Sequence, residues 1–191
     1  MTRLTREQSQ AVTRQKLLDS ARELFAKGGY GGTSIDAICE HAGYSKGAFY
    51  PHFPSKEAIF LDILEQHGTS SISALLASLD GSTSIEDAIE QMARWADERS
   101  RDRHWSLLLL EYVRHARQDD AFGREQGKKL KAGCSQLGQR LSAILGSAPK
   151  DSELLDAVIF ELAFAPAMMI TPKPSTGTLV RFALKSLLQS S

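Results

Sequence analysis

Residues 33–57 of this chain read TSIDAICEHAGYSKGAFYPHFPSKE, and this stretch is the most informative about the architecture. A hydroxyl side chain opens a helix with apolar residues at helical spacing, and Gly43 then makes a turn. Ser45 caps a second, short helix, and Pro54-Ser55 opens a third one. A helix, a glycine turn and a short helix in this order are typical of a helix-turn-helix element that reads DNA.

Local signals set the bounds of the first two helices. A long helix is predicted over residues 6–28, and Gly28-Gly29 should stop it. We expect Thr33 to cap the next helix, with Asp36 three residues later completing a pair that resembles a capping box.

The short helix after Ser45 has two different faces. Phe49 and Phe53 fall on the same side and are predicted to anchor the helix on its neighbours. Pro51 has no N–H and should crowd the carbonyl of Gly47, so we expect this helix to end or kink near residue 51. The face left for a DNA groove holds Gly47, Ala48, Tyr50 and Pro51, with Lys46 at its N-terminal edge.

Each residue type on that face suits a particular contact. Gly47 permits close backbone approach, the methyl of Ala48 matches a thymine methyl, and Lys46 can donate to guanine O6/N7 or to phosphate. The Tyr50 hydroxyl suits a phosphate oxygen, a contact that positions the protein without specifying sequence. The first turn of a helix binds phosphate well. Thr33 and Ser34 lie at the start of one predicted helix and Lys56 lies at the start of another, and all three have side chains suited to a phosphate contact.

The longer stretch TSIDAICEHAGYSKGAFYPHFPSKEAIF, residues 33–60, resembles the signature of the tetracycline-repressor (TetR) family of bacterial regulators. The resemblance covers residues 10–65. It implies a three-helix DNA-binding head, a larger helical ligand-binding body, pairing through the last two helices, and repression that a small molecule relieves. The resemblance implies the following DNA-binding residues, among which Ser45 is included as the cap of the short helix: Thr33, Ser34, Ser45, Lys46, Gly47, Ala48, Tyr50, His52 and Lys56.

His52, which is one of these residues, has a second interpretation, and two other positions in the same stretch depart from the family pattern. His52 also suits a surface or capping residue. Pro51 stands where the family often places a side chain that touches DNA, so a specific contact there is doubtful. Asp36 stands where relatives place a cation, and we expect it to cap its helix rather than to read cytosine.

Helical periodicity continues to the end of the chain, and no strand alternation stands out. The predicted fold is therefore all-α with nine helices, divided into a DNA-binding domain, 1–54, and a ligand-binding and dimerisation domain, 55–191. After the head, the predicted helices cover 55–79, 85–99, 104–117, 121–145, 153–170 and 177–188.

The helix predicted over 153–170 is apolar nearly all round, which indicates burial on every side. A second subunit would cover the excess apolar surface, so we expect a homodimer; a core helix of a monomer is the alternative. The residues assigned to the dimer interface are Leu155, Ile159, Leu162, Met169, Leu179, Phe182 and Leu187.

Aromatic residues of the body indicate a cavity for an apolar or aromatic effector, although each of them also suits core packing. The residues assigned to this pocket are Trp95, Trp105, Leu109, Tyr112, Phe122, Phe160 and Phe164.

The bulk properties limit the other function classes. The 191 residues have a net charge of zero, and residues 1–60 carry eight Lys/Arg against six Asp/Glu, so DNA binding must depend on locally placed groups. Neither cysteine belongs to a C-x-x-C pair, so we predict no metal site. No nucleophile–base set or phosphate loop stands out, so we predict that the protein has no cofactor and no enzymatic activity.

The N-terminus lacks the apolar core of a signal peptide, and no apolar run spans a bilayer, so a cytoplasmic protein without membrane contact is expected. The prediction is a homodimeric repressor that a small ligand releases from a pseudo-palindromic operator. The alternatives are a ligand-independent activator or architectural DNA-binding protein, and a helical small-molecule-binding protein or enzyme.

Overall fold

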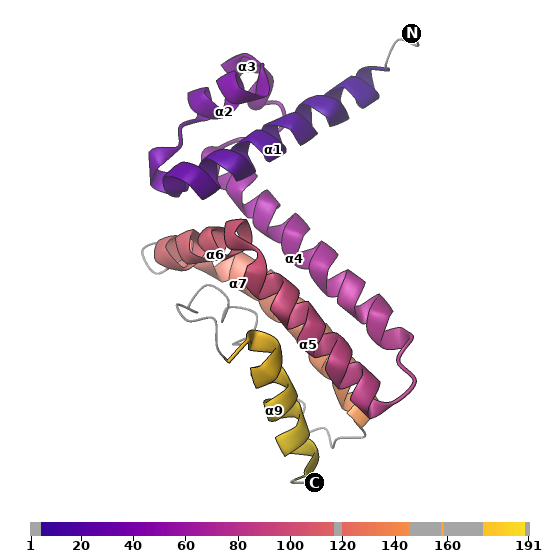
Figure 1. The fold of residues 1–191 in the computed structure, drawn as a ribbon. Helices are drawn as coiled ribbons and strands as arrows, with labels where there is room; N and C mark the ends of the chain where they lie inside the picture. The colour runs from indigo at the N-terminus through magenta and orange to yellow at the C-terminus, as the bar shows by residue number, and fades with distance from the viewer. Residues whose placement is uncertain (1–4, 117–119, 146–157, 159–173, 190–191) are drawn as a thin grey trace. The chain divides into compact units, whose positions relative to one another are not determined.

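The computed structural model describes residues 5–116, 120–145, 158 and 174–189 (Figure 1). All regular elements among them are helices, which confirms the all-α prediction. The predicted helix at 153–170 lies outside the described residues apart from Val158. The eight described helices are α1 (Arg6–Gly32), α2 (Ile35–Ala42), α3 (Lys46–Phe49), α4 (Lys56–Asp80), α5 (Ile85–Arg101), α6 (Arg103–Ala116), α7 (Asp120–Leu145) and α9 (Thr176–Gln189).

The chain forms two compact units, residues 1–64 and residues 65–191. We call them the head unit and the body unit. Helix α4 begins in the head unit and continues into the body unit, whereas the predicted domain boundary, after residue 54, precedes the whole of α4. That boundary stays a prediction.

The first helix of the head unit begins and bends at residues that favour those conformations. The Thr5 side chain accepts from the N–H of Gln8 while the Gln8 side chain accepts from the N–H of Thr5, a complete capping box. Gly29 has φ 71° and ψ 167°, a backbone state open to glycine, so the helix bends there and makes one further turn. The predicted stop at Gly28-Gly29 therefore lies at the bend.

The predicted cap of α2 is wrong by one residue. Ser34 is the N-cap, and its side chain accepts from the N–H of Ala37 at 3.1 Å. The Thr33 side chain is turned inward and donates to the backbone oxygens of Gly29, at 2.9 Å, and Leu24, at 3.2 Å. Since the capping site is filled by Ser34, the capping role predicted for Asp36 is wrong as well.

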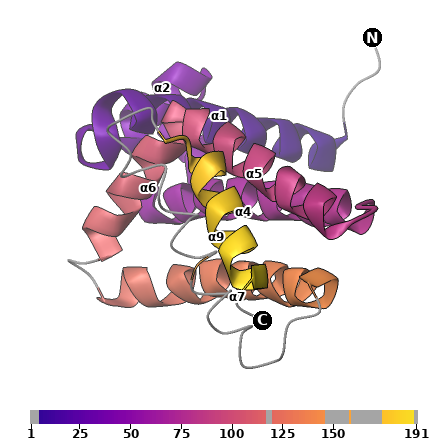
Figure 2. The ribbon, with the colours of Figure 1, turned by 60° about the horizontal axis from the view of Figure 1, so that its bottom comes forward.

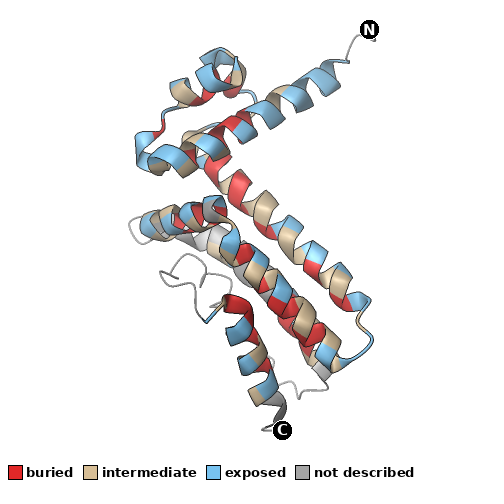
Figure 3. Ribbon diagram, viewed as in Figure 1, coloured by how far each residue is buried: buried red, intermediate tan, exposed pale blue. Residues whose placement is uncertain are grey.

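One side of α5 carries apolar residues at helical spacing, and the core of the body unit forms on that side. Figure 3 shows the buried positions along α5. Helix α9 packs against α5, as two views of the ribbon show (Figures 1 and 2). The core residues that α4, α5, α7 and α9 contribute are Leu75, Leu79, Ala88, Ile89, Met92, Ala96, Leu137, Leu141, Val180 and Leu184.

Polar contacts fix the register between α5 and α9. The N–H of Gly177 donates to Asp97 Oδ1 at 2.7 Å. Arg181 donates from Nε and Nη2 to the two carboxylate oxygens of Glu90, at 2.7 and 2.9 Å. Such two-pronged Arg–carboxylate pairs are more directional than a single contact between charges.

The Glu90–Arg181 pair makes the stability of the body unit depend on pH. The hydrogen bonds from Arg181 lower the pKa of Glu90 below its usual 4.5. Because the folded pKa lies below the unfolded one, the stabilisation is present above pH 4.5 and is lost as the pH falls through the folded value. We expect Glu90→Gln to melt at a lower temperature than wild type at neutral pH, and the difference to narrow on acidification. Thermal melts of both proteins from neutral to acidic pH measure this difference in melting temperature. A difference that stays constant with pH would contradict the prediction.

Candidate nucleic-acid interface

The turn between α2 and α3 depends on Gly43. This residue has φ 76° and ψ 31°, in the left-handed region that side chains disfavour. Its N–H donates to the backbone oxygen of Glu40 at 3.1 Å, and the N–H of Tyr44 donates to that of Cys39 at 2.9 Å. These bonds close α2 and redirect the chain into α3.

Helix α3 is a single turn, as Pro51 predicts. It covers Lys46–Phe49, and Ser45 is its N-cap, although the Ser45 side chain makes no capping hydrogen bond. After Pro51, the N–H groups of His52 and Phe53 donate back to the oxygen of Phe49, at 2.9 and 3.0 Å. Proline has no N–H to extend the helical ladder, so the helix ends before it.

Two aromatic rings hold α3 on the head unit, as predicted. Phe49 is 0% exposed and Phe53 is 2% exposed, with their ring centroids 5.6 Å apart. The Arg14 guanidinium lies 5.1 Å from the Phe53 centroid and also pairs with Asp62. These contacts set which side of α3 is turned outward.

The outward side presents most of the residues assigned to DNA. Tyr50 is 50% exposed, while Ala48 and His52 are half-buried. At the start of α2, Ser34 is exposed, but the Thr33 side chain is buried and bonded to backbone oxygens. The remaining exposed positions on this surface are Ser45, Lys46, Gly47 and Pro51.

Lys46 and Asp36 form an ion pair on this surface. The Lys46 Nζ atom lies 3.0 Å from Asp36 Oδ1 and 3.1 Å from Oδ2. The hydrogen bond that Lys46 donates to the Asp36 carboxylate raises the pKa of Lys46, which keeps the ammonium group charged. The chain positions are ten residues apart, and periodicity within either helix does not reveal the pair.

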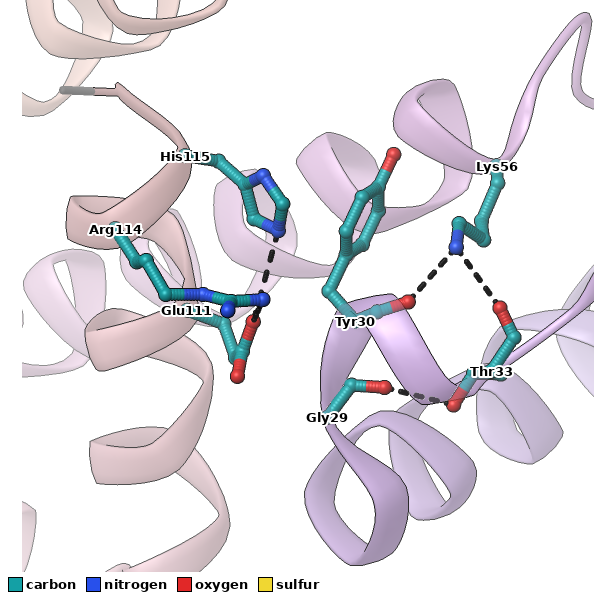
Figure 4. A network of polar contacts seen from close by, with 7 residues as sticks. All are labelled: Gly29, Tyr30, Thr33, Lys56, Glu111, Arg114 and His115. Carbon is teal, nitrogen blue, oxygen red and sulfur yellow. Dashed lines mark hydrogen bonds and ion pairs between the residues drawn. The ribbon is translucent and has the colours of Figure 1, made fainter. Parts of the chain in front are cut away.

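Lys56 has a structural partner that the sequence reading missed (Figure 4). Its Nζ atom donates to the backbone oxygens of Tyr30, at 2.8 Å, and Thr33, at 2.9 Å. It also lies 4.3 Å from the centroid of the Tyr30 ring. Burial lowers the pKa of Lys56. The ammonium group thus ties the start of α4 to the end of α1.

Replacing this lysine should weaken the head unit. We expect Lys56→Met to lower the free energy of unfolding by about 1–3 kcal/mol, since hydrogen bonds from a charged donor to two backbone oxygens are lost. Urea unfolding of the full chain measures the change. Lys27→Met is the matched control, because Lys27 is exposed and its contact with the Glu23 carboxylate is 3.8 Å long. Equal losses in the two variants would contradict the assignment.

In the body unit, one residue assigned to the effector pocket lines an open cavity. The cavity has a volume of about 310 Å³, and Trp95 lies on its wall with its indole N–H donating to Ser71 Oγ at 2.8 Å. The other lining residues are His67, Ser70, Ser71, Ala74, Glu98, Arg99 and Asp102.

Three further residues assigned to that pocket have described side chains, and none of the three lines this cavity. Trp105, Leu109 and Tyr112 are buried side chains, and Trp105 stacks on His67 with centroids 4.4 Å apart. The side chains of Phe122, Phe160 and Phe164 lie outside the described residues. The effector-binding assignment stays a prediction.

A small polar cluster lies on α6 (Figure 4), and none of its residues lines the cavity. Glu111 Oε2 accepts from Arg114 Nη2 at 3.2 Å and lies 3.6 Å from His115 Nε2. This cluster has only two residues of metal-binding type, and no group of three His, Cys, Asp or Glu residues that could hold a metal ion occurs among the described residues.

Two of the residues assigned to dimerisation are exposed on α9. Phe182 is 73% exposed and Leu179 is 38% exposed. Leu155, Ile159, Leu162 and Met169, and the side chain of Leu187, lie outside the described residues. The homodimer therefore stays a prediction. The exposed Phe182 ring lies on the helix that is expected to form its interface.

The geometry defines a class of protein. A short helix anchored by two rings, preceded by a glycine turn and exposed on its outer side, is a helix-turn-helix unit. Residues 17–63 match the family described as bacterial regulatory proteins, tetR family. The resemblance seen in residues 33–60 is therefore confirmed for this segment, which is similar to the tetR family.

Curated relatives agree with this placement. The transcriptional regulator UidR of Escherichia coli is 31% identical over 80 residues, 42% of this chain and 41% of UidR. The transcriptional repressor AcnR of Corynebacterium efficiens is 29% identical over 110 residues, 58% of this chain and 54% of AcnR. The chain thus spans about half the length of these relatives or less.

Solved structures match the fold over nearly the whole chain. A putative TetR-family regulator from Mesorhizobium loti gives a TM-score of 0.75 at 19% identity, covering 98% of both chains. The regulator FadR of Bacillus subtilis, solved in complex with stearoyl-CoA, gives 0.68 at 17% identity, covering 93% of this chain and 98% of FadR. Within the described helices, no stretch has the length and apolar character that a bilayer crossing demands.

Proposed function

We propose that this protein is a homodimeric transcriptional repressor that binds a pseudo-palindromic operator and is released by a small ligand. The observation that carries the proposal is the exposed side of α3, which two buried rings, Phe49 and Phe53, turn outward within the segment that matches the tetR family. A helix held in this way can enter a major groove with its first residues at the base edges.

DNA contact is assigned to the residues around α3. Lys46, Gly47, Ala48 and Tyr50 face outward on or next to α3, and Ser34 offers a hydroxyl at the start of α2. Phosphate contacts from such groups set register and affinity, and base-edge contacts set sequence preference. Neutralised phosphates also make binding weaken as salt rises.

A dimer suits a recognition helix of only one turn. Two copies related by a two-fold axis read two half-sites, which doubles the contacts. The exposed Phe182 ring and Leu179 on α9 support pairing through this helix, because a second subunit would bury them. Sedimentation of wild type and Phe182→Glu tests this: we expect a dimer for wild type and a monomer for the variant.

Effector binding is assigned to the body unit. The cavity beside Trp95, of about 310 Å³, falls at the small end of ligand pockets, and the Trp95 ring among its otherwise mostly polar lining residues supports an aromatic ligand. FadR of Bacillus subtilis was solved with stearoyl-CoA, so a protein of this fold holds a small ligand. A ligand releases DNA when it binds better to the conformation that cannot dock on the operator.

A gel shift with the full chain tests the function. The probe is duplex DNA from upstream of its own gene, and the competitor is unrelated duplex of equal length. We expect a shifted band that unlabelled probe removes at far lower concentration than competitor, and that indole, as an aromatic effector probe, weakens. No sequence-specific shift would favour a helical small-molecule-binding protein or enzyme. A specific shift that indole leaves unchanged would favour the ligand-independent alternative over an aromatic effector of this kind.

A further inference from the structure

Asp36 and Lys46 lie together on the surface assigned to DNA, although they belong to different helices. Both carboxylate oxygens of Asp36 are within 3.1 Å of Lys46 Nζ. The two side chains are 68% and 53% exposed, so neither is part of the head core. An exposed ion pair of this kind adds little to stability.

The Asp36 carboxylate does not cap α2, the helix to which Asp36 belongs. Ser34 accepts the capping hydrogen bond from Ala37, at 3.1 Å. Asp36 therefore has acceptor capacity left, because a carboxylate has about four lone-pair sites and Lys46 uses part of them. Lys46 likewise has three N–H donors, of which the pair with Asp36 needs only one or two.

We propose that Asp36 and Lys46 together read one G·C base pair in each half-site. This assignment rests on the proposed function. In the major groove, guanine presents two adjacent acceptors, N7 and O6, and its partner cytosine presents the N4 amino donor beside them. Lysine suits the two acceptors and aspartate suits the donor, so the pair matches the edge of one base pair in one orientation.

The chemistry distinguishes this role from phosphate binding. A carboxylate placed beside a phosphate is repelled, and pairing with Asp36 cancels much of the Lys46 charge that would attract a phosphate. Against A·T, the adenine amino group replaces the second acceptor, so one lysine N–H would face a donor. The ion pair is thus better matched to the edge of a base pair than to the phosphates of the DNA backbone.

The experiment is selection of bound sequences from a randomised duplex library by the full-length protein. Wild type, Asp36→Ala and Lys46→Met are compared, with Asp19→Ala as the control that makes the same charge change on α1. Thermal melts first establish that each variant folds. Affinities for the selected half-site, and for duplexes changed at one base pair, then follow from gel shifts.

We expect wild type to prefer G·C at one position of each half-site by about 5- to 150-fold over A·T. Asp36→Ala and Lys46→Met should each lose that preference at the same base pair, and Asp19→Ala should keep it. If Asp36→Ala tightens binding to every sequence and leaves all base preferences unchanged, Asp36 only repels phosphates and the inference is wrong. Loss of preference at two different base pairs also overturns it. If wild type selects no sequence, the proposed function itself fails.

Discussion

Phe49→Ala should unfold the head unit and abolish DNA binding. The ring is 0% exposed, and its centroid lies 5.6 Å from that of Phe53. Removing a fully buried phenyl group costs about 3–5 kcal/mol, from lost burial and from the cavity left behind. Urea unfolding followed by circular dichroism measures the loss, and the gel shift should disappear at the same protein concentration.

Tyr50→Phe is the matched control for this prediction, since it retains the neighbouring ring and removes only a hydroxyl from a side chain that is 50% exposed. We expect its stability to stay within about 0.5 kcal/mol of wild type, as for most surface changes. Its operator affinity should fall modestly, because one proposed phosphate contact is lost. A Phe49→Ala protein as stable as Tyr50→Phe would show that α3 is not anchored by its aromatic side.

Gly177→Ala should loosen α9 from α5. A Cβ atom at residue 177 would lie 2.5 Å from the backbone oxygen of Ala93 and 2.5 Å from Asp97 Oδ2. The backbone oxygen cannot swing aside as a flexible side chain does, so α9 must move away and strain the bond from the Gly177 N–H to Asp97. Overpacking of this kind costs about 1–3 kcal/mol. The unfolding midpoint in urea measures it.

The same substitution should also weaken the dimer, because α9 carries the exposed Phe182 of the proposed interface. Gly32→Ala is the control: a Cβ there meets nothing within 4 Å. We expect this control to match wild type in both unfolding and sedimentation. If Gly177→Ala behaves like Gly32→Ala, the close approach of α9 to α5 does not limit stability.

Corrections to the sequence-based expectations concern side-chain partners. Sequence reasoning chose Thr33 over Ser34 as the cap of α2, since both are good capping residues and local rules do not separate neighbours. What separates them is the inward turn of Thr33 toward the Gly29 and Leu24 oxygens. Lys56 was assigned to phosphate by its place in a first helical turn, yet its ammonium group is bonded to two backbone oxygens of the head unit.

Sequence patterns alone were enough to predict the approximate positions of the described helices, which side of α3 is buried, and that α3 stops before Pro51. These features depend on apolar spacing, caps, a positive-φ glycine and a missing N–H, all of which act within a few residues. Only the tertiary structure decided that Lys56 bonds carbonyls 23 and 26 residues away, and that Gly177 meets Asp97 across 80 residues. Such pairs form when separate helices pack, and their geometry is set by the whole core rather than by neighbouring residues.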